Sequence, residues 1–192
     1  TWRSRRCCFF SPHPLTPAAG MHTMERNERA KTVLETHPIP PLYDEHSRIL
    51  ILGSFPSVKS RAGMFFYHHP QNRFWKVIAG VLGRETPQTI EEKAAMLHES
   101  HIALWDVIAR CEITGSQDSS ISHAEPNDLG EIFAAAPIRA IFLNGGTAWT
   151  YFCRTKKDWG VPAFKLPSTS PANAAWTLPK LLGAWAVILP YL

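Results

Sequence analysis

The feature that most constrains the fold is an apolar run that ends in glycine and leads into a long polar stretch. Residues 49–53 read ILILG, the pattern of a buried strand that enters a tight turn. The next twenty residues are rich in Ser, His and Pro and end before the aromatic pair Phe74 and Trp75, which predicts a long loop over 54–73. Loops that diverge at the carboxyl end of such a strand leave a crevice where ligands bind. The loop is therefore either a binding site or a surface loop with structural histidines.

Segments with strand and helix character alternate after this loop. Apolar runs predict strands over residues 102–108, 138–143 and 163–166. Apolar residues at helical spacing, with their start and stop signals, predict helices over 74–82, 89–100, 128–136, 147–157 and 174–184. The charged stretch 25–35 is compatible with a helix, and the polar stretch 111–128 is expected to be a loop. Such alternation is typical of an α/β protein with a mostly parallel sheet covered on both faces.

Composition limits the classes of protein to consider. The 192 residues are 45% hydrophobic and carry a formal net charge of +4, which is typical of a globular chain and favours a polyanionic partner only mildly. The four cysteines lack the paired spacing of a zinc or iron–sulfur site. No apolar run is long enough to cross a bilayer. We expect a cytoplasmic protein without membrane contact.

The first 24 residues differ from the rest. A basic start is followed by a Pro- and Ala-rich stretch without periodicity, so we expect residues 1–24 to be a disordered extension. The remaining residues, 25–192, have the length of one domain.

Polar residues follow three of the predicted strands, after Gly53, Leu143 and Leu166. Because parallel strands end at the same edge of a sheet, we expect these loops to meet. The sequence NGG at 144–146 is by itself typical of a turn. The sequence LPSTSPAN at 166–173 presents hydroxyl and N–H groups ahead of a helix, which suits either a phosphate or a helix N-cap. The motifs of P-loop NTPases, dinucleotide-binding folds and serine hydrolases are absent from the sequence.

These motifs together resemble one family. GSFPS at 53–57, YHHPQNRFW at 67–75, a strand that ends in Asn-Gly and the late LPSTSPAN are similar to the uracil-DNA glycosylase superfamily, in particular its hypoxanthine-DNA glycosylase branch. The resemblance implies a three-layer α/β/α sandwich with a short, mostly parallel central sheet. It also implies that residues 25–192 are the catalytic domain of a monofunctional DNA glycosylase of base excision repair, a monomer that works without metal or cofactor. The enzyme is expected to be associated with the nucleoid when it acts. Such an enzyme flips hypoxanthine (deoxyinosine) or other deaminated bases out of double-stranded DNA and removes them hydrolytically.

The resemblance also assigns residues by position. The catalytic amides are expected to be Asn72, whose carbonyl oxygen can hold a water, and Asn144, which can donate to the departing base. The residues expected to bind the base are Gly53, Ser54, Phe55, Pro56, Tyr67, His69 and Phe74. The residues expected to contact DNA are Ser57, Ser168, Thr169, Ser170 and Pro171.

The first motif departs from that of relatives that act on uracil, which carry Asp or Asn inside it. Ser54 and Ser57 stand there instead, which favours hypoxanthine. Two alternatives remain open: a uracil or thymine mismatch glycosylase, and a non-catalytic protein of the same fold that binds damaged DNA. The sequence does not decide which aromatic ring stacks on the flipped base. It also leaves open whether His68 and His69 contact a ligand or form a structural turn. No lysine lies within the motifs, which favours hydrolysis over a Schiff-base route.

Overall fold

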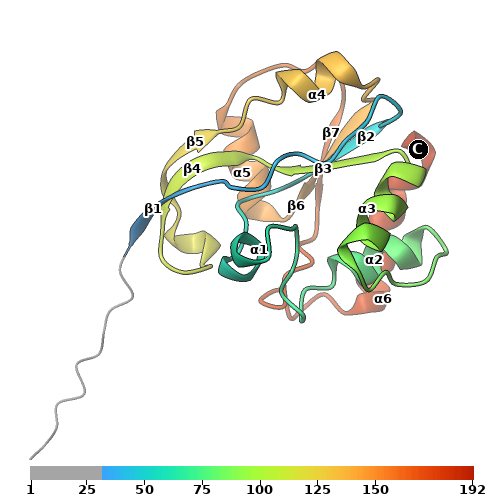
Figure 1. Cartoon of the computed structure of the whole chain (residues 1–192), viewed down its shortest axis with the longest axis horizontal. Coiled ribbons are helices and arrows are strands. Elements are labelled where there is room, and N and C mark those ends of the chain that lie inside the picture. The colour runs from blue at the N-terminus through green and yellow to red at the C-terminus, as the bar shows by residue number, and fades with distance from the viewer. Residues whose placement is uncertain (1–31) are drawn as a thin grey trace, which may run out of the picture.

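A four-stranded parallel sheet lies at the centre of the structure, a computed structural model that describes residues 32–192 (Figure 1). The strand order is β3-β2-β6-β7. The strands are β2 (Ile49–Gly53), β3 (Ile102–Asp106), β6 (Ala140–Asn144) and β7 (Ala163–Leu166). Every residue of the two inner strands, β2 and β6, is buried, as expected for apolar runs covered on both faces.

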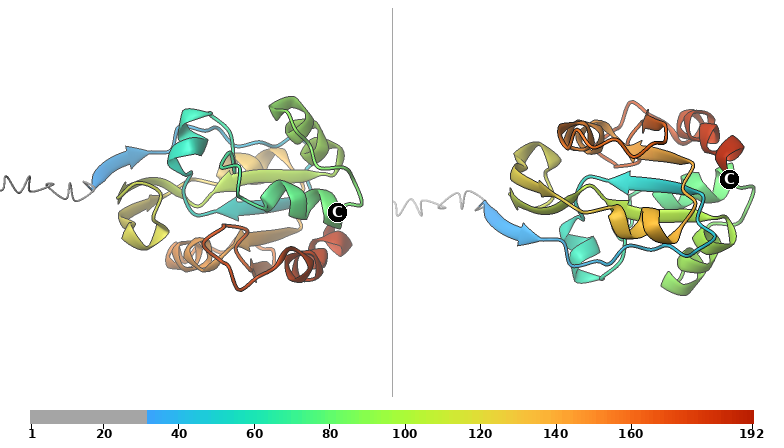
Figure 2. Two further views of the ribbon diagram at one scale, coloured as in Figure 1. Left: turned by 90° about the horizontal axis from the view of Figure 1, so that it is seen from below. Right: turned by 90° about the horizontal axis from the view of Figure 1, so that it is seen from above.

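Helices cover both faces of this sheet and complete three layers (Figure 2). One face packs against α2 (Phe74–Val81), α3 (Ile90–Glu99), α6 (Leu178–Trp185) and the short 3-10 helix η2 (Ala186–Tyr191). The opposite face packs against α4 (Gly130–Ala135) and α5 (Gly146–Arg154). The side chains of β2 alternate between the two cores, with Ile49 and Ile51 in the first and Leu50 and Leu52 in the second. The predicted α/β/α sandwich with a mostly parallel sheet is confirmed.

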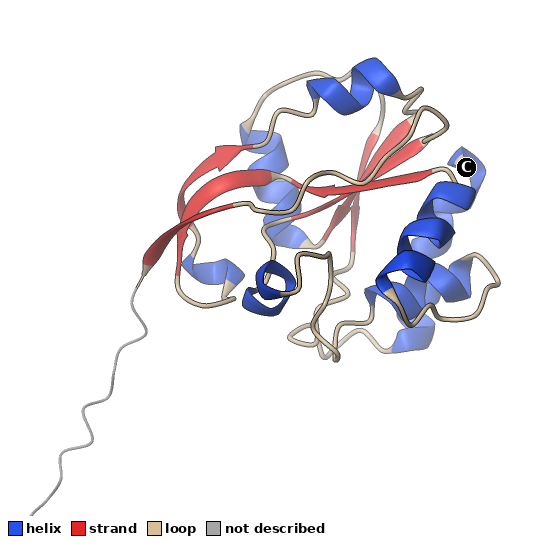
Figure 3. Cartoon of the chain, in the orientation of Figure 1, coloured by secondary structure: helices blue, strands red, loops and turns tan. Residues whose placement is uncertain are grey.

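The structure contains a second, antiparallel sheet (Figure 3), which was not predicted. Its strands are β1 (Val33–Thr36), β4 (Ile108–Ile113) and β5 (Ser122–Pro126), in the order β1-β4-β5. The expected loop over 111–128 is therefore wrong, because these residues form much of a hairpin closed by the 3-10 helix η1 (Asp118–Ser120). The buried residues of β4 are Ile108, Cys111 and Ile113. This irregular spacing, which accompanies register shifts against β5, conceals the strand in the sequence.

The expected helical character of residues 25–35 is also wrong where the structure describes it. Val33–Thr36 pairs with β4 as an edge strand, so pairing with a distant segment overrides a weak local preference. The expected strand over 102–108 is divided at Val107, where the chain passes from one sheet to the other. The predicted extension over residues 1–24 lies outside the described residues.

The long loop after β2 contains a short helix, α1 (Val58–Ala62). Ser57 is its N-cap, and the Ser57 side chain accepts a hydrogen bond from the backbone N–H of Ser60. The prediction of an uninterrupted loop over 54–73 is therefore wrong in this one turn. The last helix, α6, begins at Leu178 and not at residue 174, because residues 170–176 form a loop held by tertiary hydrogen bonds.

Within residues 32–192, no helix is both long and apolar enough to cross a membrane. The same residues contain no group of three His, Cys, Asp or Glu side chains arranged to bind a metal ion.

Candidate active site

The loops after β2, β6 and β7 meet in one cleft at the carboxyl edge of the parallel sheet. Gly53 pairs with Asp106 and Asn144 with Leu166 in the strand register, so the strands end level with one another. The cleft has a volume of about 720 Å³, within the range of ligand sites. Its lining comes from residues 53–57, 60, 66, 67, 69, 72, 106, 113, 116–119, 144, 147 and 168–173. The sequence therefore predicted correctly that the three polar strand ends converge.

Asn72 and Asn144, which lie far apart in the sequence, are joined through one threonine. Asn144 Oδ1 accepts from the backbone N–H of Thr169, and Asn144 Nδ2 donates to Thr169 Oγ1, both at 3.0 Å. Thr169 Oγ1 in turn donates to Asn72 Oδ1 at 3.0 Å. The two amides and the threonine form one hydrogen-bonded unit at the edge of the sheet.

The orientation of the Asn72 amide follows from these contacts. Its Oδ1 atom also accepts from the backbone N–H of Phe74 at 3.0 Å, so both lone pairs of this oxygen are used. The expected water on the Asn72 carbonyl oxygen therefore has no free lone pair to bind. The Nδ2 group makes no hydrogen bond within the described residues, and it is the part of Asn72 that can act on a ligand.

Thr169 lies inside the protein, although the sequence suggested a contact with DNA. It is fully buried, and its hydroxyl both accepts from Asn144 and donates to Asn72. In this arrangement the hydroxyl is not available to a phosphate. The role that the contacts support is to hold the two amides.

Replacing Thr169 by valine is expected to lower the free energy of unfolding by about 1–3 kcal/mol, because a buried amide N–H of Asn144 loses its acceptor. Serine at the same position keeps the hydroxyl and is expected to retain most of the stability. Urea unfolding of both variants measures the difference. Equal stability of the valine and serine variants would contradict a hydrogen-bonding role for this hydroxyl.

Arg73 joins two loops, a function that the sequence did not reveal. One is the loop after β2 that contains Asn72, and the other is the loop over residues 167–177 between β7 and α6, called the late loop below. Arg73 Nε donates to the carbonyl oxygen of Thr169 at 3.3 Å, and Arg73 Nη2 donates to those of Ser170 and Asn173 at 2.6 and 3.1 Å. Nη1 donates to the carbonyl oxygen of Trp176. The one basic residue in YHHPQNRFW was the available signal, since a guanidinium is suited to binding several acceptors at once.

The remaining positions of the late loop stay at the surface of the cleft. Ser168 Oγ accepts from the backbone N–H of Ser170, and Ser170 Oγ accepts from that of Ala172. Each hydroxyl keeps its own hydrogen for a further acceptor, and Pro171 is exposed beside them. These three residues remain candidates for contact with a phosphate.

The first motif forms the opposite wall. Ser54 Oγ donates to Asp118 Oδ2 at 2.8 Å, and Phe55 packs edge-on against the ring of His37. Burial raises the pKa of Asp118 above its ordinary value; the hydrogen bond from Ser54 opposes the rise and the charge of Asp106 adds to it. Ser57 and Pro56 also line this wall.

Two carboxylates at the cleft, Asp106 and Asp118, were missed by the sequence-based assignment. Asp106 stands at the end of a predicted strand, which was a usable signal because that strand ends at the same edge. Asp118 lies in the hairpin taken for a loop, so the sequence offered no signal for it.

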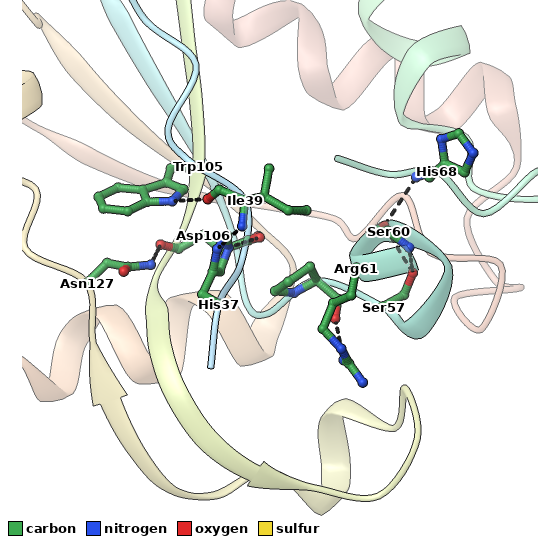
Figure 4. A network of polar contacts seen from close by, with 10 residues as sticks. His37, Ile39, Ser57, Ser60, Arg61, His68, Trp105, Asp106 and Asn127 are labelled. Carbon is green, nitrogen blue, oxygen red and sulfur yellow. Dashed lines mark hydrogen bonds and ion pairs between the residues drawn. The ribbon is translucent and has the colours of Figure 1, made fainter. Parts of the chain in front are cut away.

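The aromatic candidates differ in whether they line the cleft or are buried behind it. Tyr67 lines the cleft, and its ring stacks on Phe74 with centroids 4.0 Å apart. Phe74 is fully buried behind it and does not line the cleft, so it supports Tyr67 and is not placed to meet a base itself. His69 lines the cleft, whereas His68 is exposed outside it, beyond α1 (Figure 4).

Most of the chain is similar to known proteins. The sequence model of the Uracil DNA glycosylase superfamily matches residues 40–188. A protein named Hypoxanthine DNA glycosylase from Methanosarcina acetivorans is 36% identical over 136 residues, which cover 70% of this chain and 85% of that protein. A protein of the same name from Methanosarcina barkeri is 31% identical over 114 residues, which cover 58% of this chain and 72% of the relative.

A solved structure is similar as well. The solution NMR structure of a Methanosarcina acetivorans protein, assigned in its description to uracil DNA glycosylases, superposes with a TM-score of 0.69 at 30% sequence identity. The match covers 82% of this chain and 99% of that one. The chain belongs to the uracil DNA glycosylase superfamily.

Proposed function

We propose that this protein is a monofunctional DNA glycosylase that removes hypoxanthine from double-stranded DNA by hydrolysis. The observation that carries the proposal is the unit of Asn72, Thr169 and Asn144, which directs amide groups from two loops into one cleft. The names of the relatives, Hypoxanthine DNA glycosylase, support the choice of base.

The cleft suits the chemistry of a flipped nucleotide. Extrusion of a base costs a few kcal/mol, and stacking on an aromatic ring recovers about 1–3 kcal/mol. Tyr67 supports such stacking because its ring lines the cleft and is held from behind by Phe74. Cleavage of the glycosidic bond places negative charge on the departing base, and the 6-oxo group of hypoxanthine can carry it. The amide N–H groups of Asn72 and Asn144 are then donors to that charge.

The DNA strand runs across the rim of the cleft in this proposal. Ser57, Ser168, Ser170 and Pro171 bind its backbone and offset part of the cost of base flipping. Residues 25–192 act as one catalytic domain and as a monomer, without metal or cofactor. The enzyme works in the cytoplasm, on the nucleoid when it repairs DNA, and also accepts other deaminated bases at lower rates.

A single-turnover assay tests the proposed function. Wild-type protein is incubated in excess with matched duplexes that carry hypoxanthine, xanthine, uracil or a G·T mismatch, and abasic sites are cleaved with alkali. We expect the fastest strand cleavage with hypoxanthine. Uracil cleaved at least as fast as hypoxanthine would favour a uracil or mismatch glycosylase, and binding without cleavage of any duplex would favour a non-catalytic protein.

A further inference from the structure

The floor of the cleft contains a polar group without a partner. The hydroxyl of Tyr67 is buried and makes no hydrogen bond within the described residues. Burial raises the pKa of this hydroxyl, with the charge of Asp106 adding to the rise and the neighbouring Asn144 amide opposing it, so the group stays protonated and can donate. A buried hydroxyl without a partner is costly, which indicates a place for a water or ligand atom.

Gly53 brings a carboxylate to the same place. A Cβ atom on Gly53 would lie 2.1 Å from Asp106 Oδ1 and 2.9 Å from the Tyr67 hydroxyl oxygen. Both oxygens therefore lie over the bare Cα of Gly53, and only glycine leaves room for them. The strand register explains the approach, because Gly53 and Asp106 are paired residues at the ends of β2 and β3.

His37 determines which oxygen of Asp106 faces the cleft (Figure 4). His37 Nδ1 accepts from the backbone N–H of Ile39 at 3.2 Å, so the ring proton of the neutral histidine is on Nε2. Nε2 then donates to Asp106 Oδ2 at 2.8 Å. The two side chains are only 2% and 6% exposed, and Asp106 Oδ1 makes no hydrogen bond within the described residues.

The amide oxygens in the cleft already hold donors, and so does one oxygen of Asp118. Asn72 Oδ1 holds two donors, and Asn144 Oδ1 holds the backbone N–H of Thr169. One oxygen of Asp118 holds the hydroxyl of Ser54. Within the described residues Asp106 Oδ1 is free and lies beside the free hydroxyl of Tyr67, so a water there can accept from Tyr67 and donate to Asp106.

We propose that Asp106 activates the attacking water, that Tyr67 holds this water, and that His37 is a positioning residue for the carboxylate. The inference rests on the proposed function. In the reaction, the water oxygen bonds to C1′ of the flipped nucleotide, and the C1′–N9 bond breaks with its electron pair leaving on the base. The water proton passes to Asp106 Oδ1 and then to the released base or to solvent. The charge of Asp106 also stabilises the positive charge that develops on the sugar.

The proposal accounts for the serines of the first motif. The motif at 53–57 contains no carboxylate or amide side chain, because its polar residues are Ser54 and Ser57. Here the neighbouring strand β3 supplies the carboxylate, at the residue paired with the glycine that begins the motif.

The first test replaces Asp106 by asparagine, which keeps the shape and an acceptor for His37. We expect the single-turnover excision of hypoxanthine to slow by about 10²–10⁴-fold, the usual contribution of a general base. Affinity for the same duplex is expected to change little. Asp44→Asn is the matched control, because Asp44 forms the other partly buried Asp–His pair, with His98 at 2.9 Å, away from the cleft.

Two further sets of variants keep the proposal testable if Asp106→Asn does not fold. Tyr67→Phe removes a hydroxyl that binds no described residue, so its melting temperature is expected to stay the same or rise, while excision slows by roughly 3- to 10-fold, the effect of one hydrogen bond. His37→Gln keeps an N–H donor and is expected to restore most of the rate that His37→Phe loses.

The outcomes separate this inference from the proposed function. A wild-type protein that cleaves no duplex would overturn the function itself. With an active wild type, an unchanged rate for Asp106→Asn would overturn the role of Asp106, and an unchanged rate for Tyr67→Phe would overturn the role of Tyr67; neither would overturn the proposed function. A change of preference among bases at an unchanged maximal rate would assign the carboxylate to base recognition and would also overturn the proposal.

Discussion

Replacing Asn72 by alanine is expected to slow excision of hypoxanthine by about 10²–10³-fold, the usual effect of removing one preorganised donor. Affinity for DNA is expected to stay nearly unchanged, because the amide lies within the cleft and not on its rim. Single-turnover kinetics and equilibrium binding to the same duplex measure the two effects. Gln71→Ala is the matched control, since Gln71 is the adjacent amide residue and is exposed outside the cleft.

A second substitution at this position separates the two ends of the amide. Asn72→Asp keeps an acceptor for the backbone N–H of Phe74 and the hydroxyl of Thr169 but loses the N–H donors. We expect Asn72→Asp to be nearly as slow as Asn72→Ala, since the oxygen is already used and the nitrogen is free. A rate close to wild type for Asn72→Asp would show that the oxygen carries the function.

Replacing Arg73 by methionine is expected to cost several kcal/mol of stability and most of the excision activity. Four carbonyl oxygens of the late loop lose the guanidinium as a donor. Three of them keep a backbone N–H donor, so the loss is that of the charge-assisted hydrogen bonds, which contribute about 1.5–3 kcal/mol each and less where water replaces the guanidinium. Arg73→Lys is expected to recover only part of the loss, because an ammonium cannot reproduce the planar fork of donors. Urea unfolding and single-turnover kinetics measure both effects.

The matched control for Arg73 is Lys76→Met. Lys76 is exposed on α2 and makes no hydrogen bond to the late loop. Lys76→Met therefore removes the same positive charge without removing contacts to that loop. If Arg73 acted mainly as a phosphate contact, its variants would reduce the salt dependence of DNA binding while leaving stability intact. That result would contradict the structural role that its contacts indicate.

The sequence predicted where the site lies but not what its individual atoms do, because those roles depend on residues far apart in the chain. The convergence of Gly53, Asn144 and the late loop followed from the carboxyl ends of parallel strands, which a pattern of alternating elements already implies. The roles of individual atoms did not follow. The use of both lone pairs of Asn72 Oδ1 depends on Thr169, 97 residues later in the chain, and no local pattern encodes such a contact.

Burial decided the cases in which a residue type suggested the wrong environment. Thr169 and Phe74 belong to types that bind phosphates and bases, but both are fully buried and act on their neighbours. Conversely, Asp106 was not singled out for the site although it lies near the end of a predicted strand, and its pairing with His37 joins residues 69 apart. Strand β4 was concealed because the spacing of its buried residues is irregular.

The sequence by itself determined that strands alternate with helices along the chain to build a mostly parallel sheet, and it determined the edge at which the polar loops meet. This was possible because hydrophobic periodicity and the rules of parallel sheets act over short stretches of chain. Only the tertiary structure decided the second sheet, the clamp of Arg73 and the free oxygen of Asp106. Each of these depends on hydrogen bonds between segments that become neighbours after folding, and the energy of such contacts is not encoded in either segment alone.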